Sequence, residues 1–308
     1  MTDPAERAWR RVRASADPRQ ALEDEIGPAE LKSLLMGVSQ RRAAAVSPAR
    51  LLERWESDPS VRAAGSDPRR VARLEADLWD LLPGEFAGID LSPVAPLGTC
   101  SAMAPVSQHK VVSTTRGTEV VSDPTNVLAL EAAVRRREPG TAAVHLAACH
   151  RVLRGQPLDG PGLFQHFRLF ALVSSARDTG SGRTEAALLT AHLRFWTRAL
   201  GGLLRGREVT VRWTAFGFPP LAERMADTVL PALEPLPPGV TVREDPERER
   251  ARGYYERGAI GIDVDGGEVS DGGFTSWTAR LLGNAKERCL ISCVSTERLA
   301  AAARPGPG

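Results

Sequence analysis

The sequence predicts an α+β protein in which an antiparallel β-sheet is flanked by helices and preceded by a helical N-terminal extension. Two strongly apolar segments, 144–154 and 166–175, flank the turn-forming residues PLDGPG, a pattern typical of a β-hairpin. Further on, short apolar strands alternate with stretches whose apolar residues recur at helical spacing. Residues 1–69, by contrast, carry helical patterns alone.

Composition and charge indicate a globular protein. With 308 residues, 42% of them hydrophobic and 25% charged, the chain can form one large domain and an appendage. Forty basic and 38 acidic side chains leave a net charge of +2, which is not the strongly basic balance typical of nucleic-acid-binding domains. The sequence has neither an apolar run near ~20 residues nor a signal-peptide core at MTDPAERAWRRVR, so we expect a cytoplasmic protein without a membrane segment.

The cysteines do not predict a metal site or a disulfide framework. Cys100, Cys149, Cys289 and Cys293 lack CxxC spacing and are not accompanied by histidines at metal-ligand spacing. We expect reduced cysteines in the core, and the sequence assigns no residue to a metal ion.

We expect two units, a helical extension over residues 1–69 and a core over residues 70–308. Within the extension, segments 5–16, 21–40 and 47–58 have helical spacing and are separated by Asp-Pro or Ser-Pro pairs, which favour helix starts. Its arginines are typical of a solvated helix face; binding of RNA or of a partner is the alternative.

A long helix and a short strand begin the core. Asp67 is the expected N-cap, Pro68 the first helical residue, and a strand follows that ends at Pro93. The apolar stripe of this helix comprises Val71, Leu74, Leu78, Leu81 and Leu82. The segment 109–121 then predicts two short strands before a helix that is capped by Asp123 and ends near Pro139.

The hairpin at 144–175 brings an arginine and a phenylalanine close together. Arg154 ends its first strand, and Phe167 stands in the second. Without further information, Arg154 reads as a surface residue of the hairpin and Phe167 as a core aromatic. A helix over 183–203 follows, in which His192 lies on the apolar face and is expected to pack or to find a hydrogen-bond partner rather than to bind a metal.

The remaining elements are strands at 208–217 and 239–245, a helix at 221–233 between them, and a hairpin around Asp265-Gly266-Gly267. The stretch 271–303 predicts a sharp glycine turn, a short helix that ends at Gly283, a strand over Cys289–Val294, and a helix that opens with Glu297-Arg298. Such a segment places one arginine at the junction of a buried strand and a helix.

This last stretch resembles the final signature of the class II aminoacyl-tRNA synthetases, in which a strand runs into a "G-x-E-R" helix. Other signatures of that family follow the right order upstream. The helix, strand and proline of 67–93 are similar to the first signature, which forms the dimer interface in the family, and Val152-Leu153-Arg154-Gly155-Gln156 with His166-Phe167 resembles the second. The similarity covers about residues 70–303 and is greatest to the branch of histidyl-tRNA synthetase and the ATP phosphoribosyltransferase regulatory subunit.

The resemblance implies a site for ATP and Mg²⁺. Arg154 and Gln156 would contact ATP, with Arg154 at the α-phosphate and the attacking carboxylate; Phe167 and Arg298 would lie on opposite faces of adenine. Forming an acyl adenylate brings two anions together, and a planar guanidinium can hold both through forked hydrogen bonds. Arg250 falls where the family's "R-G-L-D-Y-Y" signature has an arginine at the α-phosphate; the alternative is a solvated arginine.

The same resemblance implies an amino-acid pocket. The turn Asp123-Pro124-Thr125 occupies the place of "R-P-E-x-T", which holds the substrate amino group, although a helix cap alone would explain Asp123. Tyr254 and Tyr255 stand at the tyrosines of "R-G-L-D-Y-Y", and Gly272 and Gly273 at the glycines of "GGRYD". These residues would border the acyl substrate.

Several positions depart from the family pattern. Ala251, Arg252 and Gly253 replace the glycine, leucine and aspartate of their signature, and Ile291 and Ser295 replace two glycines of the last one. The polar positions after Phe167 read Arg-Leu-Phe-Ala-Leu-Val here. The departures argue against histidine as the substrate, and Ile291 puts nucleotide binding in doubt. Only ARPGPG follows Ala302, where a synthetase of this branch continues into an anticodon-binding domain, so we do not expect tRNA charging.

Our leading hypothesis is ATP-dependent adenylation of an amino acid or related carboxylate, with transfer to an acceptor other than cognate tRNA, such as a carrier protein or a small molecule. The alternative is a non-catalytic synthetase paralogue that acts as a regulatory or partner-binding subunit, for which the altered pocket is the motivation. A third hypothesis, a tRNA-binding module, rests only on the arginines of the extension. A homodimer is expected from the resemblance to the first signature.

Overall fold

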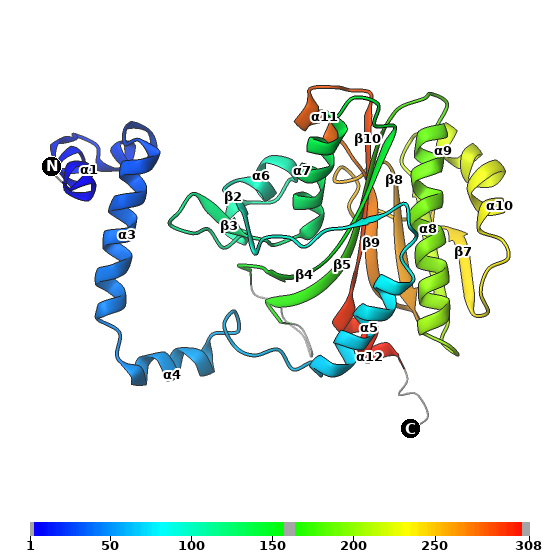
Figure 1. Ribbon diagram of the computed structural model, residues 1–308, viewed down its shortest axis with the longest axis horizontal. Coiled ribbons are helices and arrows are strands. Elements are labelled where there is room, and N and C mark those ends of the chain that lie inside the picture. Colours follow the sequence, from blue (N-terminus) through cyan, green and yellow to red (C-terminus); the bar gives the residue numbers. More distant parts are fainter. Residues whose placement is uncertain (1–2, 157–163, 304–308) are drawn as a thin grey trace.

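An eight-stranded sheet forms the centre of the computed structural model, which describes residues 3–156 and 164–303 (Figure 1). Its strand order is β1-β4-β5-β10-β9-β8-β6-β7. Neighbours from β4 to β6 in this order are antiparallel, whereas the edge strands β1 and β7 run parallel to β4 and β6. The predicted α+β class with an antiparallel sheet is therefore confirmed. The strands are β1 Ala87–Gly88, β4 Ala143–Leu153, β5 His166–Arg177, β6 Val209–Ala215, β7 Val240–Glu244, β8 Glu256–Val264, β9 Gly267–Thr275 and β10 Glu287–Ser295.

Helices cover both faces of this sheet, because its central strands are apolar on both sides. On one face α5 (Pro68–Asp80), α8 (Arg183–Leu203) and α12 (Thr296–Ala302) pack in the larger hydrophobic cluster, beside a bundle formed by α9 (Pro219–Arg224), η3 (Met225–Val229) and α10 (Leu230–Leu233). On the other face lie α6 (Thr99–Met103), α7 (Pro124–Arg136) and α11 (Trp277–Leu282). Successive residues of β10 alternate accordingly: Leu290 and Val294 pack in the first cluster, Cys289 and Ile291 in the second.

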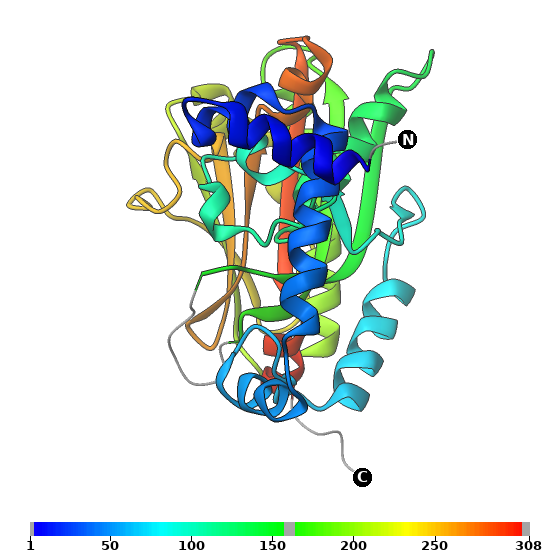
Figure 2. The ribbon, with the colours of Figure 1, turned by 90° about the vertical axis from the view of Figure 1, so that its left-hand side faces the viewer.

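The extension is helical, as its sequence predicts. It comprises α1 (Pro4–Ala14), α2 (Pro18–Gln20), η1 (Ala21–Glu25), α3 (Pro28–Ala44) and α4 (Pro48–Ser57). The helix expected over 21–40 is interrupted at Ile26-Gly27, because Pro28 starts a new helix there. Figures 1 and 2 show these helices as an arm beside the core. A contact of 3.2 Å between Met36 Sδ and Thr115 Oγ1 joins α3 to the core, whereas α4 exposes Leu51, Leu52 and Trp55. The division of the chain at residue 69 stays a prediction.

Two local expectations were wrong. The segment 271–274, expected to be a sharp turn, lies within β9, because paired backbone groups of β8 and β10 flank it on both sides. The segment 109–121 contributes one strand, β3 (Thr118–Val120), which pairs with β2 (Val94–Pro96), whereas Gln108–Lys110 forms a single turn of 3₁₀ helix (η2). The β8–β9 hairpin does turn at Asp265-Gly266, both with positive φ, as its sequence predicts.

A chain of hydrogen bonds runs through the core between the sheet and α8. His145 Nδ1 lies 2.7 Å from Ser174 Oγ, which lies 2.9 Å from His192 Nε2. His192 Nδ1 in turn lies 2.8 Å from Ser292 Oγ, which accepts from Trp196 Nε1. A neutral His192 satisfies all these groups, which confirms the expectation of a hydrogen-bonded core histidine. Burial lowers its pKa well below the ordinary value.

Because of His192, we expect the free energy of unfolding to fall as the pH decreases below about 6.5. In that range the unfolded chain takes up a proton that the folded protein excludes, so stability falls by at most about 1.4 kcal/mol per pH unit for this group. Urea unfolding between pH 7.5 and 5.5 measures the slope. His192→Gln should reduce it but not abolish it, because burial also lowers the pKa of His145 and His150, whereas His109→Gln, at an exposed position, should leave it unchanged. Equal slopes in the wild type and His192→Gln would contradict the assignment.

Candidate active site

Four of the residues predicted to hold ATP border one cavity. Cavity A, of about 540 Å³, lies where β4 and β5 meet β9 and the start of α12. Arg154, Phe167, Arg250 and Arg298 line it, together with Ser270 and the carboxylates of Glu268, Asp271 and Glu297. These arginines and the phenylalanine come from segments that are far apart in the chain. The sequence predicts a shared site for them, and in the structure all four line cavity A.

Strand pairing positions each of these side chains. Val152 pairs with Phe167 and Leu153 with His166 across β4 and β5, and the N–H of Arg154 donates to Gln165 O at 2.8 Å, so Arg154 and Phe167 are neighbours. The Arg154 guanidinium carbon lies 5.0 Å from the centre of the Phe167 ring. Arg298 stands in the first turn of α12, which Ser295 caps, and its guanidinium donates to Glu268 O at 3.4 Å.

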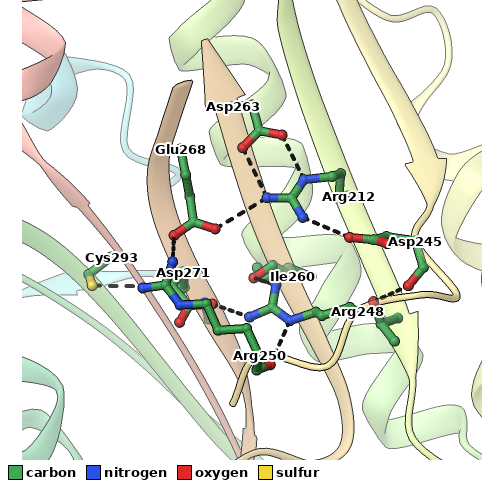
Figure 3. A network of polar contacts seen from close by, with 11 residues as sticks. Arg212, Asp245, Arg248, Arg250, Ile260, Asp263, Glu268, Asp271 and Cys293 are labelled. Atoms are coloured by element: carbon green, nitrogen blue, oxygen red, sulfur yellow. Dashed lines mark hydrogen bonds and ion pairs between the residues drawn. The ribbon is translucent and has the colours of Figure 1, made fainter. Parts of the chain in front are cut away.

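The carboxylates around cavity A are already engaged by arginines. Glu268 pairs with Arg250 and, at 3.2 Å, with Arg212. Arg212 also binds Asp245 and Asp263, and its hydrogen bonds, those to Asp263 above all, raise its pKa (Figure 3). The result is a layer of neutralised charge beneath the cavity.

A second arginine of this layer, Arg248, was missed at the sequence level. Its side chain is buried, pairs with Asp271 at 2.5 Å, and donates to Ile260 O at 3.3 Å (Figure 3). The prediction chose Arg250, which is mostly exposed and reaches the edge of cavity A. Only the turn between β7 and β8 decides which of the two arginines points inward, and the arginine-rich sequence carries no signal for it.

The remaining carboxylate of cavity A, Glu297, fastens the end of the extension. Its Oε1 lies 3.0 Å from Arg151 Nη2 and accepts a hydrogen bond of 3.3 Å from Ser66, while Oε2 accepts from the N–H of Arg168. Gly65 and Ser66 consequently line cavity A. No motif in residues 1–69 predicted this contact.

Arg154 and Arg298 therefore carry positive charge that no carboxylate neutralises within residues 3–156 and 164–303. Arg154 is half-buried and Arg298 is exposed. A half-buried guanidinium without an anionic partner is costly, so the position of Arg154 favours an anionic ligand.

A second cavity, cavity B, of about 190 Å³, is also lined by Arg154. Predicted residues that line it are Asp123, Arg154, Gln156 and Tyr254, and its other lining residues are Cys100, Val106, Lys110, Ser122 and Asn126. Burial, and after it the charge of Asp123, raises the pKa of Tyr254, so the phenol stays protonated at neutral pH. Arg154 thus borders both cavities.

The other predicted substrate residues are not among those that line cavity A or B, and of these Thr125 contacts the cavity residue Asp123. Asp123 Oδ1 caps α7 by accepting from Thr125 N–H at 2.9 Å and from the Thr125 hydroxyl at 2.7 Å, and Thr125 is buried. Tyr255 is buried against Tyr254, with ring centres 4.9 Å apart. Gly272 and Gly273 lie inside β9, and neither is among the residues that line cavity A or B.

Two further groups that sequence reasoning missed are buried and unpaired. The amide Nδ2 of Asn126, bordering cavity B, and the hydroxyl of Ser270, bordering cavity A, find no hydrogen-bond partner in the part of the chain that the structure describes. Unpaired buried polar atoms are uncommon in folded proteins, and both lie beside cavities.

Among the described residues, no group of three His, Cys, Asp or Glu side chains could hold a metal ion. None of the described helices could cross a membrane.

Comparison with known proteins identifies the fold. No family model and no curated protein matches the chain. Among solved structures, an ATP phosphoribosyltransferase regulatory subunit/histidyl-tRNA synthetase from Bacillus halodurans C superposes with a TM-score of 0.59 at 11% identity, over 79% of this chain and 82% of that one. Histidyl-tRNA synthetase from Nostoc sp. PCC 7120 gives 0.58 at 12% identity, over 79% and 74%. A histidine–tRNA ligase subunit from Alicyclobacillus acidocaldarius gives 0.53 at 12%, over 78% and 95%. The chain therefore has the class II synthetase-like fold, as its sequence predicts.

We expect Gly273→Ala to destabilise the fold by about 1–3 kcal/mol, because an added Cβ would lie 2.6 Å from the Tyr255 ring and 2.7 Å from Gly258 O. Urea unfolding gives the value. Gly267→Ala is the matched control in the same strand, since its Cβ would meet nothing closer than Val264 O at 3.5 Å. Equal free energies of unfolding for the two variants would show that the packing of the Tyr255 ring does not require glycine at position 273.

Proposed function

We propose that this chain activates an amino acid or a related carboxylate with ATP, and passes the acyl group to an acceptor other than cognate tRNA. The observation that carries the proposal is the position of Arg154, which borders cavity A and cavity B and has no carboxylate partner among the described residues. Cavity A would take ATP and cavity B the acyl substrate. The reacting carboxylate and the α-phosphate would then meet at one guanidinium.

Cavity A fits a nucleotide in its chemistry. Phe167 and Arg298 offer a ring and a planar cation for adenine, and Arg154 offers positive charge for the phosphates. Arg250 is the weaker candidate at the phosphates, because it already pairs with Glu268, and the unpaired hydroxyl of Ser270 offers a hydrogen bond. In the structure the Arg154 guanidinium lies on the Phe167 ring, so adenine would take the other face of the ring or displace this contact.

The proposed reaction needs little acid–base chemistry. A carboxylate oxygen attacks the α-phosphorus, the bond from that phosphorus to the bridging oxygen breaks, and pyrophosphate leaves with the bond electrons. No proton moves in this step. Arg154 would hold both anions and stabilise the charge on the phosphoryl oxygens, which is the kind of contact whose loss costs on the order of 10²–10³ in rate.

Cavity B would bind the acyl substrate. Asp123 offers a carboxylate for an ammonium group, and Gln156 and Tyr254 border the same space. Thr125 fixes Asp123 by two hydrogen bonds, and Tyr255 supports Tyr254 through ring contact. Gly272 and Gly273 would act indirectly, by letting β8 and β10 approach β9 closely. Asp123 and Tyr254 would thus contact the substrate, and the other predicted substrate residues would hold these two in position.

One observation favours the second candidate, a non-catalytic subunit that binds a regulatory ligand or a partner. Magnesium needs oxygen ligands, yet Glu268, Asp271 and Glu297 are each held by an arginine. The residues present therefore do not fit a dedicated magnesium site, and we assign the ion no step. Binding of an amino acid with no effect of ATP, or co-purification with an enzyme, would support this second candidate. A homodimer and a carrier-protein acceptor remain proposals.

We expect Arg298→Ala to weaken ATP binding roughly 5- to 30-fold, as loss of a cation–π contact of about 1–2 kcal/mol implies. Calorimetry with and without magnesium gives the affinity.

We expect Arg154→Ala to reduce ATP–pyrophosphate exchange at least ~100-fold. Arg243→Ala, at an exposed position on the far edge strand β7, makes the same change in net charge and should alter neither value. Exchange unaffected by Arg154→Ala would overturn the proposed role of this residue.

A further inference from the structure

The amide of Asn126 is the most unusual polar group beside cavity B. Asn126 is the third residue of α7, only 2% exposed, and its Nδ2 has no hydrogen-bond partner among the described residues. Leaving a buried donor unpaired costs roughly 1–3 kcal/mol. The helix cap does not use this amide, since Asp123 and Thr125 already satisfy each other at the helix start.

A ligand in cavity B could supply the missing acceptor. The groups of an amino acid divide naturally among the residues that line the cavity. Its carboxylate would go to Arg154, and its ammonium group to Asp123, the only acidic side chain among the described residues that line cavity B. The Asn126 amide is then left for the substrate side chain. Because an NH₂ group only donates, the side chain must offer an acceptor.

The size and lining of the cavity restrict that side chain further. A volume of about 190 Å³ is below the usual range for drug-sized ligands. Cys100 and Val106 supply an apolar wall, and burial raises the pKa of the Cys100 thiol, which keeps it neutral. A bulky or aromatic side chain does not suit this space.

We infer that cavity B selects a small amino acid whose side chain carries a hydrogen-bond-accepting oxygen, and that Asn126 determines this selectivity. The inference rests on the proposed function in one respect, that cavity B holds the acyl substrate. It does not require that the substrate be adenylated.

The test uses substrate pairs that match in shape and differ in the acceptor: threonine with valine, serine with alanine, and asparagine with leucine. Equilibrium dialysis measures binding of each amino acid to the full chain without ATP, and pyrophosphate exchange measures activation. In at least one pair we expect the wild type to prefer the polar member roughly 5- to 150-fold, as one unpaired buried donor implies.

Asn126→Leu replaces the amide by an apolar group of similar shape. We expect this variant to lose the preference for the polar member, and to unfold at the same or a higher temperature, because an unpaired donor has been removed. Asn126→Ala provides the same comparison if leucine does not fit the helix. Gln40→Leu, at an exposed position in α3, is the control for the change of residue type.

The outcomes separate this inference from the proposed function. Selective binding without pyrophosphate exchange would support the inference and overturn adenylation. Exchange with equal rates for the members of every pair would support adenylation and overturn the inference. A preference that persists in Asn126→Leu, or no binding of any of these amino acids at millimolar concentration, would also overturn it.

Discussion

The pairing of β10 with its two neighbours is the constraint on which the rest of the structure depends. All nine residues of β10 pair with β5, and six of them pair with β9. This register fixes Cys293 and Ser295 at the edge of cavity A and starts α12 with Arg298 beside Glu268. The same register carries Ser292 to the opposite face, where it meets His192. A slip by one residue would exchange the two faces, so that the side chains now at cavity A would point into the core beside α8, and the side chains now packed there would point to the opposite face.

Charge pairing decides which groups remain available to a ligand. Arg212 and Arg248 lie within the protein and neutralise the carboxylates of Glu268 and Asp271. Neither the acids nor these arginines could be buried alone at acceptable cost, because a buried unpaired charge is strongly unfavourable. What is left over at the cavity walls is the positive charge of Arg154 and Arg298. The site therefore prefers anions because the ion pairs of Arg212 and Arg248 occupy the nearby carboxylates. These two arginines need not contact the ligand themselves.

Local sequence predicted the elements and part of the site, but not the contacts made across the sheet. Apolar runs and turn residues were enough to place the β4–β5 hairpin and hence Arg154 beside Phe167. The segment around Gly272-Gly273 read as a turn, because glycine signals turns and close packing alike; only the Tyr255 ring, held by another strand, distinguishes the two. Likewise, the local sequence around Asn126 does not indicate that its amide is unpaired. The residues that surround it in cavity B are scattered along the chain between Cys100 and Tyr254.

The position of Arg154 between two cavities has a thermodynamic consequence. An anion bound in one cavity reduces the positive potential that the shared guanidinium offers to an anion in the other, so before any bond forms the two occupants oppose each other electrostatically. Linkage requires this antagonism to be reciprocal: the factor by which the first ligand weakens the second equals the factor by which the second weakens the first. Two cavities that are separate in space are therefore coupled in binding free energy whenever both occupants are anions.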